Sequence, residues 1–568
     1  MATVRPARTR TGRTPRRTTR RPDAGAAASP SDEGETSMAD TTNSTSATGE
    51  GPSLRERAEA LQNRAETIRT AMGGQDKIDR IHENGRYTIR ERIAKLLDSG
   101  SFHEVGTFAF SEREADRGNT PGDGKIGGHG TVNGRGVAVA GDDITVKRGS
   151  SSVVGSRKLK KIYETAWSDG TPTVYFGETG GARIPDTLGS EGFVKVTPDV
   201  QNGRRNRVTP MISVICGESF GGSSFKSAYS DVVIQIKGTC LAVTSPRVIE
   251  IATSEKIDFE ALGGTSIHDQ ITGQIDCIAE DEDDAIAQVK TLLGFLPQNC
   301  WEEPPRTPWD PNIERDEKMY DIVPMKRTRA YDMRRVLKRL TDDGEIFELK
   351  PGFGRSLITA FGRIAGRTVG FVASQPMYYA GALSPDACDK ATSFLCLCDA
   401  NNIPLIFMQD TPGFMVGKQV EHDNLLARAI RFAEALSQVQ VPRLTVVTRK
   451  AFGLAFFSLS GARMGSRAVA AWPSAEISFM DPTVGANVVY AGKLAKMEPE
   501  AREAERARLV EELGSDTGPE AAAGLLEIDD IIDPAETRQW LAHHVERMDV
   551  GVPPKGTFKP LAYWPTCY

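Results

Sequence analysis

The chain has 568 residues, of which 39% are hydrophobic and 26% charged, and its formal net charge at pH 7 is −6. These proportions are ordinary for a globular protein, and the negative net charge argues against general binding to nucleic acids. No run of about eighteen apolar residues is present, so we expect no membrane-spanning helix, and the length suffices for two large domains.

The first 21 residues carry eight arginines and no acidic residue. An arginine-rich, acid-poor segment resembles an organelle transit peptide in composition, but this one lacks the apolar stripe of an amphipathic helix. A tract of Ala, Ser, Thr and Gly follows it, so we predict a disordered arm over residues 1–52. Met38 is a candidate for the true start of the chain.

Two capping boxes mark the first predicted helices. Residues 53–56 open a polar helix that runs to about Ala71, and residues 88–91 open a second helix that Gly100 closes. From Gly124 onward, short β-branched runs alternate with helical stretches, which is typical of an α/β fold.

A proline-rich segment without periodicity, residues 297–311, interrupts this alternation. We therefore predict one domain at 53–305 and a second at 306–568. The acidic run at 280–284 precedes a helical stretch, and we interpret it as charge at a helix N-terminus rather than as a cation site.

Cysteine and histidine spacing gives no sign of a metal site. The eight cysteines are scattered, with only Cys396 and Cys398 close together, and the seven histidines are scattered as well. We expect reduced, mostly buried thiols in a cytoplasmic protein. The chain also lacks a G-x-x-x-x-G-K-[ST] loop, so we expect no ATP site of the P-loop type.

The stretch Gly217-Glu-Ser219-Phe-Gly221 fits G-x-S-x-G, the nucleophile elbow of α/β-hydrolases, and an apolar run precedes it as a strand should. One hypothesis is therefore a serine hydrolase that uses Ser219. Its oxyanion support would come from the glycines at 127–130 and its base from one of the histidines.

An internal repeat argues against this hypothesis. A shift of 232 positions carries "GRGVAV" at 134 onto "GRTVGF" at 366, "GETGGA" at 177 onto "QDTPGF" at 409, and "SFGGSSF" at 219 onto "AFGLAFF" at 451. The shift holds over about ninety residues without an insertion, which predicts two copies of one fold. Ser219 then lies opposite Ala451, whereas Gly221 lies opposite Gly453, so the repeat keeps the glycine turn and not the hydroxyl.

Each copy is predicted to place small residues at two strand-to-helix corners. The first half has Gly180-Gly181 and Gly221-Gly222-Ser223, and the second half has Pro412-Gly413 and Gly453-Leu454-Ala455. Small residues let the backbone approach a ligand closely, and successive N–H groups at a helix start can stabilise a developing oxyanion.

Six stretches in order carry a family resemblance. They read "IRERIAKLLDSGSFHEVG", "TPGDGKIGGHGTVNGRGVAV", "TGGARIPD", "IPLIFMQDTPGFMVG", "RKAFGLAFF" and "AWPSAEIS". From about Arg90 to Glu476 the chain resembles the carboxyltransferase (β) subunits of biotin-dependent acyl-CoA carboxylases. The resemblance implies two tandem crotonase-like α/β domains, each with its own oxyanion hole.

The resemblance also implies roles for single residues. Gly180 and Gly181 would hold the acyl-CoA thioester oxygen, and the N–H groups of Leu454 and Ala455 would hold the ureido oxygen of carboxybiotin. Substrate contacts would come from the remaining matched positions: Arg157 and Lys158 toward CoA phosphates, and Gly221, Gly222, Gly413, Gly453 and Phe457 around the acyl and biotin groups. For Arg157 and Lys158, ordinary surface charge on a helix is the alternative interpretation.

A biotin carboxylase and a biotin carrier (α) subunit are implied as partners, since this chain shows neither an ATP loop nor the Met-Lys-Met context of a biotinylated lysine. The nearest match, Lys326, is interpreted as linker. The family typically forms β hexamers, so we expect a homo-oligomer. Biotin's own ureido nitrogen can remove the α-proton, so no protein base is required.

Two departures from the family pattern leave alternatives open. The second turn usually reads Gly-Gly-Ala and here has Leu454, and position 457, which helps to select the acyl chain, is Phe. Carboxyl transfer to an acyl-CoA is the predicted activity. A biotin-dependent decarboxylase and a non-catalytic scaffold are the alternatives from the same fold, and the serine hydrolase is the alternative from another class.

Overall fold

The computed structural model describes residues 51–195 and 207–565. The chain divides into two compact units, residues 1–59 and 60–568. All but residues 51 and 52 of the predicted arm lie outside the described residues. In the first unit, Ser53 and Glu56 form the predicted capping box, because the Ser53 N–H donates to Glu56 Oε2 at 2.7 Å and the Glu56 N–H to Ser53 Oγ at 3.3 Å. The helix that it opens, α1, spans Leu54–Ala71.

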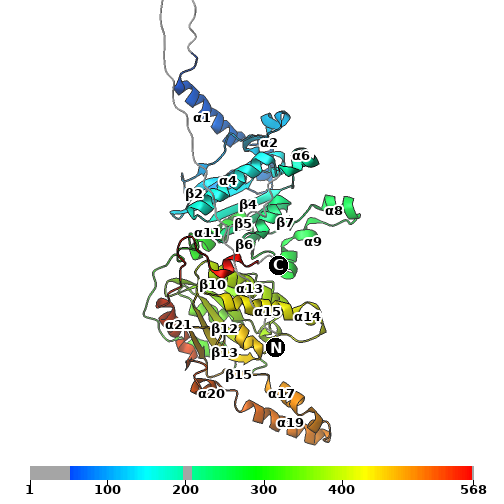
Figure 1. Cartoon of the computed structure of the whole chain (residues 1–568), viewed down its shortest axis with the longest axis vertical. Helices are drawn as coiled ribbons and strands as arrows, with labels where there is room; N and C mark the ends of the chain where they lie inside the picture. The colour runs from blue at the N-terminus through cyan, green and yellow to red at the C-terminus, as the bar shows by residue number, and fades with distance from the viewer. Residues whose placement is uncertain (1–50, 196–206, 566–568) are drawn as a thin grey trace, which may run out of the picture. The chain divides into compact units, whose positions relative to one another are not determined.

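Two eight-stranded mixed sheets form the centre of the larger unit, one in each half of the chain (Figure 1). The first sheet has the order β1-β2-β3-β4-β5-β6-β8 with β7 on β5, and the second has β9-β10-β11-β12-β13-β14-β16 with β15 on β13. In each sheet the first three strands are antiparallel and the following pairs are parallel. The strands of the first sheet are β1 His103–Glu104, β2 Lys125–Val132, β3 Arg135–Asp142, β4 Thr173–Thr179, β5 Met211–Phe220, β6 Val232–Ile236, β7 Cys240–Ala242 and β8 Cys277–Ala279. Those of the second are β9 Phe347–Leu349, β10 Leu357–Ile364, β11 Arg367–Ser374, β12 Leu405–Thr411, β13 Arg443–Phe452, β14 Ala468–Ala471, β15 Glu476–Ser478 and β16 Asp530–Ile531.

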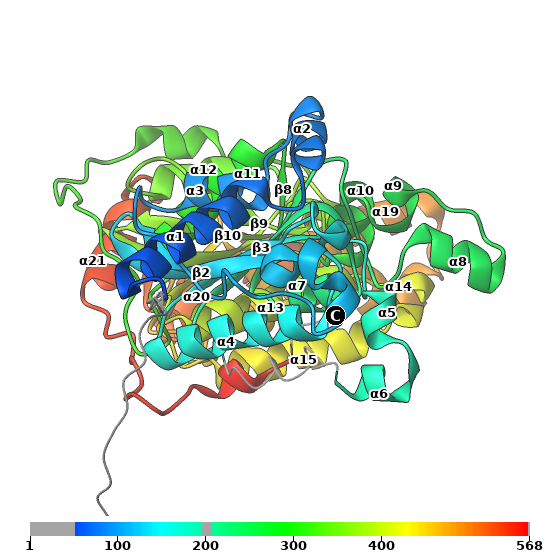
Figure 2. The same ribbon diagram turned by 90° about the horizontal axis from the view of Figure 1, so that it is seen from above.

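Helices cover both faces of the sheets (Figure 2). The α-helices that follow α1 in the first half are α2 Gln75–Glu83, α3 Ile89–Leu96, α4 Val153–Asp169, α5 Ile184–Thr187, α6 Gly189–Val194, α7 Gly222–Ala228, α8 Pro246–Thr253, α9 Phe259–Gly263, α10 Thr265–Ile267 and α11 Glu282–Phe295. Those of the second half are α12 Arg334–Leu340, α13 Pro385–Ala400, α14 Lys418–His422, α15 Leu425–Gln438, α16 Leu454–Ser458, α17 Pro482–Val489, α18 Ala491–Leu494, α19 Pro499–Gly514, α20 Pro519–Gly524 and α21 Thr537–Glu546. Short 3₁₀ turns are η1 Glu114–Asn119, η2 Pro121–Gly124, η3 Lys147–Gly149, η6 Glu317–Asp321, η7 Tyr379–Gly381, η8 Pro534–Glu536 and η9 Pro560–Tyr563, and η5 His268–Thr272 is a π-helix.

The predicted duplication is confirmed. Strands β2, β3, β4 and β5 begin 232 positions before β10, β11, β12 and β13 and have the same lengths as these counterparts. The irregularity in the β4–β5 ladder between Gly177 and Thr179 recurs in the β12–β13 ladder between Gln409 and Thr411. After the second glycine turn the shift becomes 236 positions, as β7 and β15 and the equally long helices α8 and α17 show.

Alternating side chains of the second sheet fill two cores, as strand geometry requires when both faces are covered. Ile406 and Met408 of β12 pack with α12 and α21, whereas Leu405 and Phe407 pack with α13 and α15. The latter core continues into the first half, where the ring of Phe295 in α11 stacks on Phe361 of β10 at 5.8 Å. The two halves therefore share apolar packing.

One predicted boundary was wrong. Thr88 and Glu91 form the expected capping box of α3, but the helix ends at Leu96 and not at Gly100. Leu97 is extended, and the N–H of Asp98 donates to the carbonyl of Thr131 at 2.7 Å. The helix thus ends about one turn before the predicted residue, where the chain begins to hydrogen-bond with β2, and Gly100 lies in the turn that follows.

Candidate active site

Each half brings two glycine turns together at the carboxyl ends of neighbouring parallel strands. In the first half, Gly180-Gly181 follows β4, and Gly221 connects β5 to α7. Gly181 has a φ of 107° and Gly221 a φ of 60°, a region that favours glycine. A Cβ on Gly221 would lie 3.9 Å from the Cα of Gly181, so the two turns are in contact.

The second half repeats this arrangement. Gly413 follows β12 with a φ of 126°, and Gly453 connects β13 to α16 with a φ of 62°. A Cβ on Gly413 would lie 3.7 Å from the carbonyl oxygen of Phe452, the residue before Gly453. An isolated parallel bridge holds the first turn of each half, between residues 151 and 182 and between residues 383 and 414.

Two adjacent backbone donors are available in the second half. Leu454 and Ala455 are the first residues of α16, and N–H groups at this position have no acceptor within the helix. Among the described residues the structure gives neither N–H an acceptor, whereas the next one, of Phe456, donates to Gly453 O at 3.2 Å. These N–H groups suit an oxygen that gains negative charge.

In the first half, both N–H groups predicted as donors already have acceptors within the chain. The Gly180 N–H donates to the carbonyl of Arg148 at 3.2 Å, and the Gly181 N–H donates to Thr179 Oγ1 at 3.2 Å. Both predicted donors are thus engaged within the chain. The structure gives no acceptor to the N–H of Gly222, the first residue of α7, within the described ranges.

Apolar side chains surround the second-half donors. Leu454 is 56% exposed and Phe457 41% exposed, whereas Ala455 and Phe456 between them are buried. Positions three apart share one helix face, so Leu454 and Phe457 present an apolar surface beside the free N–H groups. The carbonyl of Phe479 would lie 3.3 Å from a Cβ on Gly453, so the exposed Phe479 follows directly at this edge.

Of the predicted basic pair, only Arg157 is exposed. Lys158 is buried, and its Nζ donates to the carbonyls of Lys125 at 2.6 Å and Gly106 at 3.1 Å. Burial lowers the pKa of Lys158 to about 8. Its counterpart Lys390 is held in the same way, with one contact to the carbonyl of Leu357, the counterpart of Lys125. The buried ammonium group of Lys158 thus holds backbone carbonyls together and does not reach the surface, where it could contact the phosphates of CoA.

The hydroxyl of Ser219, the nucleophile in the serine hydrolase hypothesis, is fully buried. Ser219 has no exposed surface, and its Oγ donates to Ser223 Oγ at 2.8 Å. The single hydroxyl proton of Tyr175 is donated to Asp142 Oδ2 at 2.6 Å, and the Tyr175 oxygen lies 3.0 Å from Ser223 Oγ, whose hydroxyl can donate to it. No hydrogen bond in the described ranges joins Ser219 to a histidine. The serine belongs to a buried polar network beneath the turns.

The sequence interpretation missed a buried acidic residue two positions before each of the turns Gly180-Gly181 and Pro412-Gly413. Glu178 occupies this position in the first half and Asp410 in the second. Glu178 contacts two arginines, whereas Asp410 contacts Arg449 and Lys450. The repeat carried a usable signal, because a shift of 232 positions sets an acid opposite an acid here.

Two searches of the described ranges gave negative results. No group of three or more His, Cys, Asp or Glu side chains in residues 51–195 and 207–565 could hold a metal ion. Within the same residues, no helix is both long and apolar enough to cross a membrane.

Comparison with known proteins assigns the family. Residues 80–548 match the family model "Carboxyl transferase domain". The chain is 37% identical over 495 residues to the methylmalonyl-CoA carboxyltransferase 12S subunit of Propionibacterium freudenreichii subsp. shermanii, covering 86% of this chain and 94% of that protein. It is 35% identical over 495 residues to the methylmalonyl-CoA decarboxylase subunit alpha of Veillonella parvula, covering 85% of this chain and 94% of that protein.

A solved structure agrees. The hexameric transcarboxylase 12S crystal structure, with methylmalonyl-coenzyme A and methylmalonic acid bound, superposes with a TM-score of 0.81 at 36% identity, covering 90% of this chain and 99% of that one. The duplicated sheets, the paired glycine turns and these matches lead to one assignment. The chain belongs to the carboxyl transferase family, as its resemblance to the β subunits of biotin-dependent acyl-CoA carboxylases implied.

Proposed function

We propose that this chain moves a carboxyl group from carboxybiotin, held by a partner subunit, to the α-carbon of an acyl-CoA. The observation that carries this proposal is the pair of unengaged N–H groups of Leu454 and Ala455 in a chain of the carboxyl transferase family. Support for a CoA ester comes from the related 12S structure, which has methylmalonyl-coenzyme A bound.

The chemistry that this chain must supply is stabilisation of oxygen charge. Loss of the α-proton puts negative charge on the thioester oxygen, and donors already aimed at that position lower the barrier. Carboxybiotin, when bound, supplies the carboxyl group, and its ureido nitrogen takes the α-proton. We assign the Leu454 and Ala455 N–H groups to the ureido oxygen, because two adjacent N–H groups without an acceptor can donate to the same oxygen.

On the acyl-CoA side we assign the Gly222 N–H as a donor together with the Gly180-Gly181 turn. Gly180 and Gly181 can donate only when a bound thioester oxygen replaces the Arg148 carbonyl or Thr179 Oγ1 as acceptor. Arg157, exposed on α4, is the candidate for a charge-assisted contact with CoA phosphate. Phe457 and Leu454 would line the apolar approach. The retained second-half donors argue against a non-catalytic scaffold.

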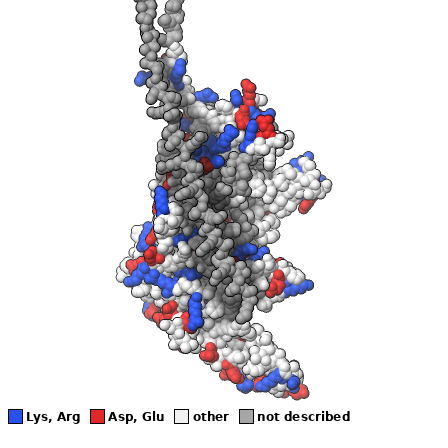
Figure 3. Space-filling view, viewed as in Figure 1, with Lys and Arg blue, Asp and Glu red and all other residues white. Residues whose placement is uncertain are grey.

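We further propose that copies of this chain associate, as those of the related 12S subunit do. Exposed apolar side chains lie near the turns of both halves, and on the face shown in Figure 3 the region of α8 and α9 is largely uncharged. Large exposed apolar patches mark interaction sites. The side chains concerned are Ile184 on α5, Leu188 between α5 and α6, Phe193 on α6, Val248 and Ile251 on α8, and Val484, Val488 and Val489 on α17.

We place this activity in the cytoplasm, together with a biotin carboxylase and a biotinylated carrier. The seven cysteines of the described ranges are free and buried, which suits a reducing compartment. The ATP-dependent step belongs to the partner, since this chain has no P-loop.

Labelled bicarbonate tests the proposal. The purified chain, its co-purifying biotinylated partner and ATP are incubated with acetyl-, propionyl-, methylcrotonyl- and longer acyl-CoA esters. Label in one ester would establish both the reaction and the substrate. No label in any ester, with a partner that demonstrably carboxylates its biotin, would overturn the carboxylation reading. Release of label from a malonyl-type ester would then identify the decarboxylase direction.

We expect Ser219→Ala to keep the transfer rate within about threefold of wild type, because the hydroxyl is buried and does not face substrate. The variant loses one hydrogen bond, worth about 1 kcal/mol of stability. Ala451 already occupies the equivalent position in the second half. Loss of activity by more than about a hundredfold in a folded variant would restore the serine as a nucleophile.

A further inference from the structure

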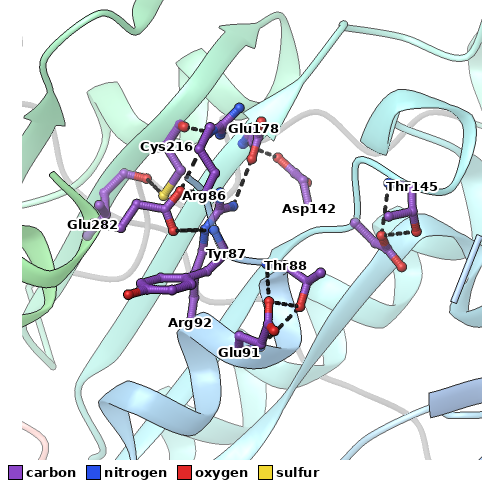
Figure 4. Close-up of polar contacts among 12 residues, drawn as sticks. Arg86, Tyr87, Thr88, Glu91, Arg92, Asp142, Thr145, Glu178, Cys216 and Glu282 are labelled. Carbon is purple, nitrogen blue, oxygen red and sulfur yellow. Dashed lines mark hydrogen bonds and ion pairs between the residues drawn. The ribbon is translucent and has the colours of Figure 1, made fainter. Parts of the chain in front are cut away.

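A buried carboxylate lies at the base of the first-half turns. Glu178 is the residue before Thr179 and the Gly180-Gly181 turn, and its side chain is 1% exposed. Its two oxygens accept from different arginines, Oε1 from Arg86 Nη2 at 2.6 Å and Oε2 from Arg92 Nη1 at 2.8 Å (Figure 4). Both arginines come from the segment that leads into and forms α3.

Arg92 connects this carboxylate to a second helix. Its side chain is 2% exposed, and its other nitrogens donate to both oxygens of Glu282 at 2.9 and 2.8 Å. Glu282 is the first residue of α11. The N–H of Glu178 itself donates to Asp142 Oδ2 at 3.0 Å. The end of β4 is therefore tied to α3, α11 and β3 at one point.

Strand β5 leaves space for the carboxylate. A Cβ on Gly217 would lie 2.6 Å from Glu178 Oε1, so no larger residue fits there without moving the ion pair. The ladder between β4 and β5 is irregular at this point, since Gly177 pairs with Ile215 but Thr179 pairs with Ser219. With the regular strand pairing interrupted, the ion pairs fix the direction in which the chain leaves β4.

In the second half, the buried acid before the turn pairs with cationic side chains from a different part of the fold. Asp410, the counterpart of Glu178, is fully buried and contacts Arg449 Nη2 at 2.9 Å and Lys450 Nζ at 3.0 Å. Arg449 stands where the first half has Gly217. The acid is retained at the repeated position, whereas its cations come from β13 in one half and from the α3 segment in the other. Retention with changed partners indicates that the position of the acid matters.

We propose that Glu178 is a positioning residue for the acyl-CoA turns and Asp410 the corresponding positioning residue for the biotin turns. This inference rests on the proposed function for the assignment of substrates to halves. Each acid holds the strand end that carries a glycine turn, and a displacement of about 1 Å at such a site can cost a hundredfold in rate. Neither carboxylate touches substrate, because both are buried behind the turns.

The duplication supplies a matched pair of variants, Glu178→Gln and Asp410→Asn. Both keep the side-chain size and remove the charge. We would measure carboxyl transfer from a malonyl-type CoA ester to free biotin, which needs no partner subunit. In this step the bond between the α-carbon and the carboxyl carbon breaks, a bond from biotin nitrogen to the carboxyl carbon forms, and the biotin N–H proton passes to the α-carbon. The exposed Glu164→Gln on α4 is the control.

We expect Glu178→Gln to raise the KM for the CoA ester by about tenfold or more and to leave the KM for biotin within twofold, and Asp410→Asn to do the reverse. A purely structural role predicts a smaller active fraction, with lower kcat and both KM values unchanged. That result would overturn the inference, as would an equal rise of both KM values in either variant.

Amide hydrogen exchange provides a readout that does not need activity. Glu178→Gln should speed exchange in residues 179–183 and 217–222 and leave residues 411–414 and 449–455 unchanged, and Asp410→Asn should do the opposite. If wild type transfers no carboxyl group while the exchange pattern holds, the proposed function fails and the anchoring stands. If exchange instead rises across the whole chain, or does not change at all, the positioning role of Glu178 and Asp410 is overturned.

Discussion

Leu454→Pro should lower the rate of carboxyl transfer by about a hundredfold to a thousandfold and leave the chain folded. Proline has no N–H, so the substitution removes one of the two backbone donors that the structure leaves unengaged. Loss of a single donor from an oxyanion hole has an effect of this size, because the donor acts where charge develops in the transition state.

The position makes this a clean test. Leu454 is the first residue of α16, where proline is well tolerated because the N–H has no acceptor within the helix. Leu454→Ala keeps the N–H and removes the exposed side chain, so it should stay within a few-fold of wild type. Leu454→Gly restores the residue usual in the family and should be at least as active. The KM for biotin reports which substrate uses the donor.

Two outcomes would contradict the assignment. A Leu454→Pro variant with the wild-type rate would show that this N–H takes no part in transfer. Equal losses in Leu454→Pro and Leu454→Ala would show that the apolar side chain, rather than the donor, matters. Circular dichroism and the size of the oligomer, compared across the three variants, verify that each is folded.

Stability should rise with pH above neutrality because of Lys390. Its side chain is 1% exposed, and Nζ donates to the carbonyls of Lys350, Phe353 and Leu357 at 2.8, 3.1 and 2.8 Å. Burial lowers the pKa of Lys390 to about 7. A lysine in an unfolded chain has a pKa of about 10.4, so between these values the unfolded state binds one more proton than the folded state.

The sign follows from this difference in bound protons. The free energy of unfolding should increase with pH from about 7 toward 10, by up to about 1.4 kcal/mol per pH unit from this group. Below pH 7 both states are protonated and the contribution is flat. Lys158, with a pKa of about 8, should add a similar rise that begins about one unit higher.

Thermal unfolding from pH 6.5 to 9.5 measures the effect. Lys390→Met removes one of the two titrating groups, so its Tm should rise less with pH than that of wild type and keep only the rise from Lys158. The stability of wild type relative to the variant should therefore increase with pH. Lys161→Met, at an exposed position on α4, controls for the loss of any lysine. Parallel curves for wild type and Lys390→Met would show that Lys390 does not titrate in this range.

The sequence was sufficient for the fold because the duplication could be read directly from residue spacing. Elements at the same shift must form the same strands and turns, and the structure places β2 to β5 and β10 to β13 accordingly. The end of α3 could not be predicted in this way. It depends on a hydrogen bond between Asp98 and Thr131, which are distant in the sequence.

The site was predicted less completely, because motif positions do not say where an N–H or an ammonium group points. Gly180 and Gly181 lie at the predicted turn, yet their donors are engaged, and Lys158 lies on the predicted helix, yet its side chain turns inward. The pairing of Glu178 with Arg92 spans 86 positions and that of Arg92 with Glu282 spans 190. No local pattern announces such contacts.

This difference in sequence separation has a consequence for how the chain is made. Asp410 and Arg449 lie 39 positions apart on adjacent strands, so the ion pair behind the second-half turns forms between residues that are close in the sequence. In the first half, the ion pairs of Arg92 with Glu178 and Glu282 can both form only after Glu282 has been synthesised. Contacts of long separation form late in folding. The turns at Gly180-Gly181 and Gly221 should therefore become ordered only after almost half of the polypeptide has been synthesised, whereas the turns at Gly413 and Gly453 become ordered as soon as their own two strands pair.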